Sequence, residues 1–413
     1  MWISRLRACK WVSMSDASST QRPRTPIPRT VWALGFVSFF MDISSETIHA
    51  LLPLFLTTTL GASVLLVGII DGVAESTAAI SKVFSGYLSD RMGRRKPLIL
   101  LGYGLGALSK PFFAIAATPL LVFGARFADR IGKGLRGAPR DALVADVTPP
   151  EIRGRAYGLR QALDTAGAFA GPLIAIVLMA LFAGNMRAVF WAALIPATLA
   201  VVLVVVGVED RAAGPDNARP PVRIADLKRL PPAFWRVVAL GVVFTLARFS
   251  EAFLILRAAD QGLPLMWAPL VLVVMNVVYS IGAYPAGDLS DRLPARTLFL
   301  WGIAALVAAD LMLAFGPGLI GVFAGIALWG AHMALTQGLL AKLVADNAPA
   351  DLRGSAFGFF NLATGVALLA ASVAAGVLWD LAGPQATFLG GVVFAAAAAL
   401  MLTSVKRSPP PAQ

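Results

Sequence analysis

Apolar runs of about 20 residues, each long enough to cross a bilayer as a helix, alternate with short polar connections along nearly the whole chain. The runs show none of the period-two alternation typical of membrane strands, so helices are predicted. The twelve predicted spans cover residues 31–53, 62–84, 98–117, 119–144, 156–182, 188–208, 237–258, 266–286, 297–315, 318–344, 355–378 and 386–405.

A charged, proline-rich stretch, EDRAAGPDNARPPVRIADLKRLPP, separates the sixth and seventh predicted spans and is typical of a linker. We therefore expect an all-α membrane protein with two six-helix bundles. Its predicted parts are a tail at 1–30, a bundle at 31–208, a linker at 209–236, a bundle at 237–405 and a tail at 406–413.

The two halves share sequence. LVADVTPPEIRGRAYG at residues 143–158 aligns with LVADNAPADLRGSAFG at 343–358, which is a spacing of 200 residues. GYLSDR at 86–91 is likewise matched by GDLSDR at 287–292. An internal duplication of this length in a polytopic protein predicts two pseudo-symmetric halves around a central site.

Of the 413 residues, 58% are hydrophobic and only 14% are charged, too few charges to cover a soluble protein of this length. The formal net charge is +12, and Lys and Arg fall at the inner ends of the spans if the N-terminus is cytoplasmic. This bias predicts a multi-pass protein of the inner membrane with both termini in the cytoplasm, and it accounts for the basic charge without a nucleic-acid partner. Arg187 and Arg257 are exceptions. The residues that set the bias are Arg22, Arg24, Arg29, Arg91, Arg94, Arg95, Lys96, Arg153, Arg155, Arg219, Arg223, Lys228, Arg229, Arg236, Arg292, Arg296, Arg353, Lys406 and Arg407.

The single cysteine, Cys9, offers neither a disulfide nor a thiolate metal site. The first 30 residues lack the apolar core of a signal peptide, and Met14 offers an alternative start to Met1. We expect no cofactor, a monomeric protein, and the lipid bilayer as its surroundings.

The connection after the second span reads GYLSDRMGRRKP at residues 86–97. Gly86 allows close helix approach, Gly93 permits a tight reversal, and Asp90 can pair with an arginine or a helix N-terminus. The copy at 287–296 keeps GxLSDR and then reads LPAR. With the duplication, these loops resemble the signature of the major facilitator superfamily (MFS) over essentially the whole chain.

The resemblance implies a secondary transporter whose signature loops latch the cytoplasmic side while the protein is open outward. The gate residues would be Gly86, Asp90, Arg91, Gly93, Arg94, Arg95, Gly287, Asp291 and Arg292. The alternative is a basic turn that only sets topology. In the fifth span, Gly167, Gly171 and Pro172 look like the GxxxGP motif of the family's antiporters, although ordinary small-residue packing explains them equally well.

Ionisable residues inside the spans are costly unless they face a partner or a cavity. By resemblance, the first, fourth, seventh and tenth spans line the central cavity. The candidates for substrate and proton binding are then Asp42, Glu46, His49, Arg126, Asp129, Arg130, Arg248 and Glu251. Asp71, Glu75, Arg160 and Asp164 form a candidate coupling or ion-pair network. Arg136 and Arg140 are expected at the cytoplasmic surface.

The structural alternative is a set of fixed pairs: Asp129 with Lys133, Arg160 with Asp164, and Asp90 with an arginine of the fourth span. Asp42, Glu46 and His49 share one helix face, but a metal site there would need further ligands. The positions 200 residues after the charged stripe of the fourth span are mostly apolar, with His332, Thr336 and Gln337 as the polar candidates nearby. We therefore expect the coupling chemistry in the first half and an apolar, aromatic wall in the second.

These features predict a proton-coupled exporter of a small organic molecule. A proton-coupled importer on the same fold is the first alternative; a non-transporting receptor and a metal-ion transporter are weaker ones. No nucleophile–base constellation or phosphate loop is visible in the sequence, so an enzyme is not expected. The cationic fourth span and Arg248 favour an anionic or zwitterionic substrate.

Overall fold

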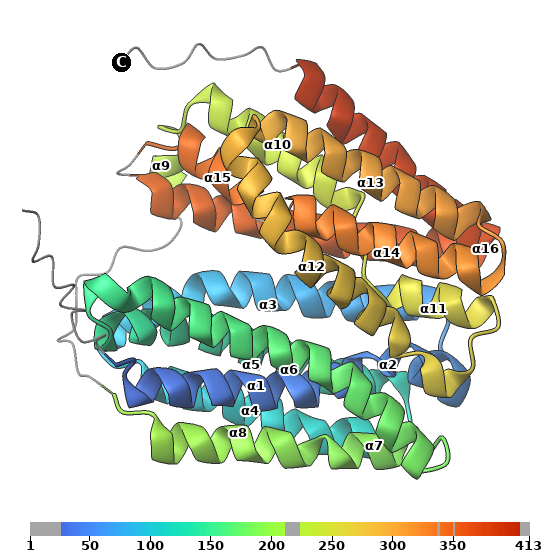
Figure 1. The fold of residues 1–413 in the computed structure, drawn as a ribbon, viewed down its shortest axis with the longest axis horizontal. Coiled ribbons are helices and arrows are strands. Elements are labelled where there is room, and N and C mark those ends of the chain that lie inside the picture. The colour runs from blue at the N-terminus through green and yellow to red at the C-terminus, as the bar shows by residue number, and fades with distance from the viewer. Residues whose placement is uncertain (1–25, 211–223, 337–338, 350–351, 405–413) are drawn as a thin grey trace, which may run out of the picture.

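The computed structural model describes residues 26–210, 224–336, 339–349 and 352–404, and every regular element in these residues is a helix (Figure 1). The predicted all-α fold class is therefore confirmed. Met1, Cys9, Met14 and most of both predicted tails lie outside the described residues.

The first half of the chain forms long helices that begin and end at recognisable capping residues. The Ser63 side chain accepts a hydrogen bond from the Leu66 N–H and caps α3, while Gly93, at φ 65°, ends it. Thr118 caps α5 in the same way, with Pro119 in the first turn. The elements are α1 (Arg29–His49), α2 (Leu52–Leu54), η1 (Phe55–Thr59), α3 (Val64–Met92), α4 (Lys96–Ile115), α5 (Pro119–Val147), η2 (Pro150–Ile152), α6 (Arg153–Leu181), α7 (Met186–Ala192) and α8 (Leu194–Gly207).

The second half differs from the prediction at one place. The helix expected at 237–258 is broken at residues 247–251, where the Ser250 hydroxyl accepts a hydrogen bond from the Ala252 N–H at the start of α11. The last two predicted spans meet at Gly383, whose φ is 85°. The elements are α9 (Ile224–Leu227), α10 (Pro232–Leu246), α11 (Ala252–Asp260), η3 (Leu265–Trp267), α12 (Leu270–Arg292), α13 (Ala295–Phe315), α14 (Gly318–Thr336), α15 (Leu339–Asn347) and α16 (Arg353–Ser404).

Nine helical stretches within the described residues are long and apolar enough to cross a membrane. One of them, Arg353–Leu402, contains both of the last two predicted spans. The stretch Pro232–Leu246 is apolar but shorter, and α5 is missing from the nine, since charged side chains recur along it. The count of twelve spans, with its bundle boundaries, stays a prediction.

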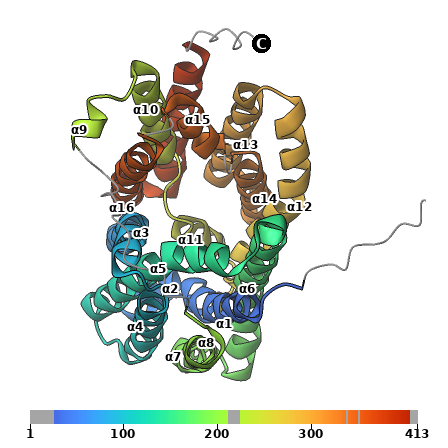
Figure 2. The ribbon, with the colours of Figure 1, turned by 90° about the vertical axis from the view of Figure 1, so that its left-hand side faces the viewer.

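Helices up to α8 gather on one side of the molecule and most of those from α10 onward on the other (Figures 1 and 2). The two groups meet where α3 packs against α16 and α6 packs against α12. Small residues permit this approach: a methyl group at Gly376 would lie 2.7 Å from the Leu65 Cα. The Leu65 N–H also donates to Asp380 Oδ2 at 3.0 Å, which joins the start of α3 to α16.

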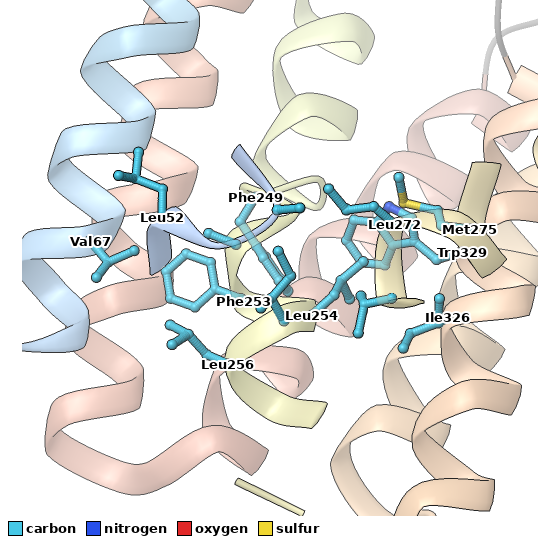
Figure 3. Packing of buried hydrophobic residues seen from close by; sticks show 14 of the residues in the cluster. Leu52, Val67, Phe249, Phe253, Leu254, Leu256, Leu272, Met275, Ile326 and Trp329 are labelled. Atoms are coloured by element: carbon cyan, nitrogen blue, oxygen red, sulfur yellow. The ribbon is translucent and has the colours of Figure 1, made fainter. Parts of the chain in front are cut away.

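A buried apolar cluster also joins the two groups beside this contact. Leu52 and Val67 from the first half pack with Phe253 and Leu256 from the second, close to Phe249 and Trp329 (Figure 3). The short helix α2 contacts α11 in the same region. The helix ends around residues 52–67 are therefore sealed by apolar side chains.

The repeated segments fold alike. In each copy, 143–158 and 343–358, the described residues end one helix and begin the next, at α5–η2–α6 and α15–α16 respectively. The Ile152 N–H donates to the Pro149 carbonyl at 3.1 Å, and the Leu352 N–H donates to the Pro349 carbonyl at 2.9 Å. The sequence duplication thus corresponds to a structural one.

Arg187 and Arg257, the exceptions to the charge bias, both bond to the ends of helices. Arg187 donates to the Ala114 carbonyl at the end of α4, at 2.8 Å. Arg257 donates to the carbonyls of Leu313 and Ala314 at the end of α13, at 2.8 and 3.3 Å. Cationic side chains stabilise the negative end of a helix, so their position there is explained structurally.

Candidate functional site

A cavity of about 470 Å³ lies between the two halves, near the middle of the long helices. Seven of the predicted candidates line it: Glu46, His49, Asp71, Glu75, Arg130, Arg248 and Glu251. Asp42, Arg126, Asp129, Arg160 and Asp164 are not among its lining residues. The cavity therefore collects most, but not all, of the ionisable residues that the sequence places inside the spans.

Asp71 of α3 forms the centre of the ionic contacts around the cavity. Its Oδ1 accepts a hydrogen bond from Arg126 of α5 at 3.0 Å, and its Oδ2 accepts one from the Ser250 hydroxyl at 2.5 Å. His49 Nε2 lies 3.8 Å from Oδ2, and His49 Nδ1 lies 3.3 Å from Glu46 Oε2. Asp71 thus links three helices of the first half to the helix break of the second.

Glu75, one turn further along α3, faces the cavity. Its carboxylate lies 3.3 Å from Arg130 and 3.7 Å from Arg126, and a third of its side chain remains exposed. Lys133 also lines the cavity. Glu75 can therefore exchange protons or partners more readily than the buried Asp71.

Asp129 lies behind the cavity wall with a partner that the sequence analysis missed. Its Oδ1 accepts a hydrogen bond from the Lys110 ammonium of α4 at 2.8 Å, and Lys110 also donates to Ser45 at 3.1 Å. Lys110 and Asp129 are 1% and 4% exposed. The expected Asp129–Lys133 pair is wrong, because Lys133 lies on the cavity side. An ionisable residue in an apolar span was a usable signal for Lys110.

A second ionic cluster joins α1, α5 and α6 nearer the ends of the helices. Arg140 lies 3.4 Å from Asp164 and 3.3 Å from Asp141, and Arg160 lies 3.7 Å from Asp164, as the structural alternative expected. The Asp42 carboxyl faces Asp164. These groups tie the helices to one another outside the cavity.

Arg136 is buried, which contradicts the expectation that it reaches the surface. Its guanidinium lies 4.5 Å from the ring centroid of the buried Tyr103, because close approach at Gly102 brings α4 against α5 there. The neighbouring Arg140 is half-buried and donates to Ser38 at 2.8 Å.

The second half lines the cavity with aromatic and neutral polar groups as well as Arg248 and Glu251. Phe249 and Trp329 provide the expected aromatic wall, with ring centroids 5.5 Å apart. Ser250 and Asn276 are polar lining residues that the sequence analysis missed. Because the chain is not helical at 247–251, Arg248 and Glu251 project from the break and not from a continuous helix.

The described contacts of the signature loop lie within the first half. Arg95 pairs with Asp90, donates to Ser89 at 2.7 Å, and lies 3.3 Å from Asp146 at the end of α5. Asp90 is therefore bound by an arginine at the start of α4, and the expectation of a fourth-span arginine is wrong. Gly86 lies against α5 at Ala138, while Arg91 and Arg94 are exposed. The side chains of Gly287, Asp291 and Arg292 lie outside the described residues.

Gly167 and Gly171 hold α6 tightly against α1. A methyl group at Gly167 would lie 2.5 Å from the Phe39 carbonyl oxygen, and one at Gly171 would lie 2.7 Å from Glu46 Cβ. Pro172 is buried beside them. The GxxxGP segment therefore packs directly behind a cavity-lining carboxylate.

The two ring nitrogens of His49 face the carboxylates of Glu46 and Asp71. Within the part of the chain that the structure describes, no group of three or more His, Cys, Asp or Glu side chains is arranged to hold a metal ion. The cavity thus presents an ionic and aromatic surface suited to a small organic molecule.

The chain matches the sequence model of the Major Facilitator Superfamily over residues 34–372 and 268–413. It is 30% identical over 382 residues to an uncharacterized MFS-type transporter of Methanocaldococcus jannaschii, covering 91% of this chain and 94% of the relative. The multidrug resistance protein MdtH of Photorhabdus laumondii subsp. laumondii is 34% identical over 139 residues, which is 34% of each chain.

Two solved structures share the fold. A POT family transporter in complex with 5-aminolevulinic acid aligns with a TM-score of 0.74 at 14% identity, over 91% of this chain and 95% of that one. The nucleoside transporter NupG aligns with a TM-score of 0.73 at 13% identity, over 91% and 98%. At these identities the likeness shows the architecture alone.

Proposed function

The chain belongs to the major facilitator superfamily of transporters, and on that premise we propose that it is a proton-coupled exporter of a small organic solute. It would act in the cytoplasmic membrane by alternating access, with the two halves rocking around the central cavity. The observation that carries the proposal is the cavity itself, where carboxylates able to take up protons lie beside cationic side chains between the halves.

Asp71 supplies a physical link between proton binding and the rocking motion. Its ionised carboxylate is held by Arg126, and the same group accepts a hydrogen bond from Ser250 of the other half. A proton on Asp71 would cancel its charge and weaken both its pair with Arg126 and its contact with His49. Arg126 would then turn to Glu75, already 3.7 Å away, and the contact between the halves would loosen.

The proposed orientation follows from charge and packing together. The basic helix ends lie on the cytoplasmic side by the positive-inside bias. The opposite end of the cavity is sealed where Leu52 and Val67 pack with Phe253. The structure would then be the state that loads solute from the cytoplasm, as an exporter requires.

Two features favour export over import. The GxxxGP segment at Gly167–Pro172 is similar to that of the family's antiporters and packs behind Glu46. Part of the chain is also similar to a multidrug resistance protein. The opposite direction, import with protons, uses the same cavity and differs only in which way the solute accumulates.

The lining favours a solute that carries charge of both signs. Arg130, Lys133 and Arg248 can hold a carboxylate, while Glu46 and Glu75 can hold an ammonium group. Phe249 and Trp329 offer an apolar wall to the rest of the molecule. An amino acid, a short peptide or an amphiphilic zwitterion matches this arrangement better than a neutral sugar.

The test uses purified protein in liposomes with an imposed pH gradient. A panel of amino acids, dipeptides and the cationic dye ethidium is screened by thermal shift, and each binder is then followed in flux assays. We expect accumulation on the acidic side for an exporter, with gradient-driven flux at least tenfold lower in Asp71→Asn. Asp346→Asn, an exposed acid of α15 outside the cavity, serves as the control. Accumulation on the alkaline side would show import, and flux indifferent to the gradient would refute proton coupling.

A further inference from the structure

Asp310, in the last third of α13, is a buried acid that the sequence analysis did not single out. The residue is 0% exposed, and among the described residues neither carboxyl oxygen has a hydrogen-bond partner. An ionised carboxylate in such a place is very costly, whereas the protonated form is neutral and far cheaper to bury. The site therefore favours an Asp310 that carries a proton.

The surroundings are shaped to hold this carboxyl group. A methyl group at Gly391 would lie 2.5 Å from Asp310 Oδ2, so the glycine leaves the room that the acid occupies. The same methyl group would lie 3.2 Å from the ring of Phe249. The Asp310 carboxyl thus lies in a notch between α13 and α16, next to an aromatic ring that lines the central cavity.

Ionisable groups on the helices that contact α13 are engaged elsewhere. His332 of α14 lies 3.0 Å from the Gly302 carbonyl through its Nδ1, and Arg257 of α11 donates to the Leu313 carbonyl. Asp380 of α16 accepts a hydrogen bond from the Leu65 N–H. None of the three hydrogen-bonds to the Asp310 carboxyl. A proton on Asp310 is thus independent of fixed ion pairs, unlike one on Asp71.

Phe249 lies in a break between two helices of the second half. It belongs to the non-helical segment 247–251 between α10 and α11, and its ring packs against Phe253, Trp329 and Phe388. A change in that segment would move the ring and open a path between the cavity and the notch.

We propose that Asp310 is a proton-binding site of the second half, which exchanges its proton with the central cavity when Phe249 moves. The inference rests on the proposed function only for the use of that proton in transport. Binding and release of the proton can be tested without any solute.

The direct test uses dicyclohexylcarbodiimide, an apolar reagent that modifies protonated carboxyl groups, on the full-length protein in liposomes. Mass spectrometry measures modification of the peptide that contains Asp310 between about pH 5.5 and 9. This range covers the raised pKa values that buried carboxyl groups can have. We expect modification at low pH that falls at least tenfold at high pH. Phe249→Ala should accelerate it several-fold, and Asp346→Asn, an exposed acid of α15, should leave it unchanged. Modification that is absent, or equal at every pH and in Phe249→Ala, would overturn the proposal.

Flux measurements separate this proposal from the proposed function. If wild-type protein shows no flux driven by a pH gradient, proton-coupled transport is refuted, while the modification assay still decides whether Asp310 exchanges a proton. If wild-type flux is coupled, Asp310→Asn should lower the number of protons moved per solute. An unchanged ratio would overturn a role for this site in transport.

Discussion

The two halves bury carboxyl groups in different ways. In the first half, the two most deeply buried carboxylates each have a cationic partner: Asp129 with Lys110 at 2.8 Å and Asp71 with Arg126 at 3.0 Å. In the second half, Asp310 has no partner, and His332 has a single backbone contact. Pairing avoids an isolated buried charge in the first half, and the proposed proton on Asp310 would avoid one in the second.

This difference bears on what each half can do. A network of paired charges has several arrangements of similar energy, since Arg126 lies within 4 Å of both Asp71 and Glu75. Such a network can respond to a proton or to a charged solute by exchanging partners. A lone acid without an ionic partner can respond only by binding or releasing a proton. The two halves thus share duplicated sequence segments, while their ionic chemistry differs.

The strongest test of the comparison removes one matched charge from each half. Asp129→Asn leaves Lys110 buried without its partner and should lower the free energy of unfolding by about 3–5 kcal/mol. Asp310→Asn removes no partner and should change it by less than about 1 kcal/mol. Denaturation of the detergent-solubilised proteins measures both, and the pair Asp129→Leu with Lys110→Met should recover most of the loss. Equal effects of the two Asn variants would abolish the distinction between the halves.

Each half has an arginine that donates hydrogen bonds to the carbonyl end of a helix, and this shared feature offers a second test. Arg257→Met would free the carbonyls at the end of α13 and should cost about 2 kcal/mol, the range for hydrogen bonds to a charged donor. Arg187→Met frees one carbonyl at the end of α4 and should cost less. Thermal unfolding in detergent gives the order. If Arg187→Met proved the more damaging, its position over the Phe55 ring, 5.2 Å from the centroid, would outweigh the missing hydrogen bond.

Much of the fold was predictable because hydrophobic runs and duplicated loops are local signals. The family, the helices and the turn shared by residues 143–158 and 343–358 all follow from them. The break at 247–251 was not predictable, since Ser250 is bound by Asp71 and by Ser372, residues far away in the chain. The sequence around residues 247–251 predicts one continuous helix over 237–258.

The site was predictable as a set of residue types, but of the expected ion pairs only Arg160 with Asp164 is found. Asp71, Glu75 and Arg130 were identified because charges are rare inside spans. Their partners depend on which helices adjoin, so Lys110 was overlooked and Lys133 was wrongly paired with Asp129. Asp310 carried the same signal within the span 297–315, but no second charge nearby marked it as part of a stripe.

The smallest expected effect concerns the contact that joins the two halves. Ser250→Ala removes the hydroxyl that donates to Asp71 and caps α11, and should cost about 1 kcal/mol of stability. Since that contact holds the break against the first half, amide hydrogen exchange should accelerate in residues 247–260 more than elsewhere. Ser109→Ala, a buried hydroxyl that bonds only within α4, is the matched control and should leave that segment unchanged. Equal exchange in both variants would mean that Ser250 is a local cap, and that apolar packing around Phe253 holds the halves together without it.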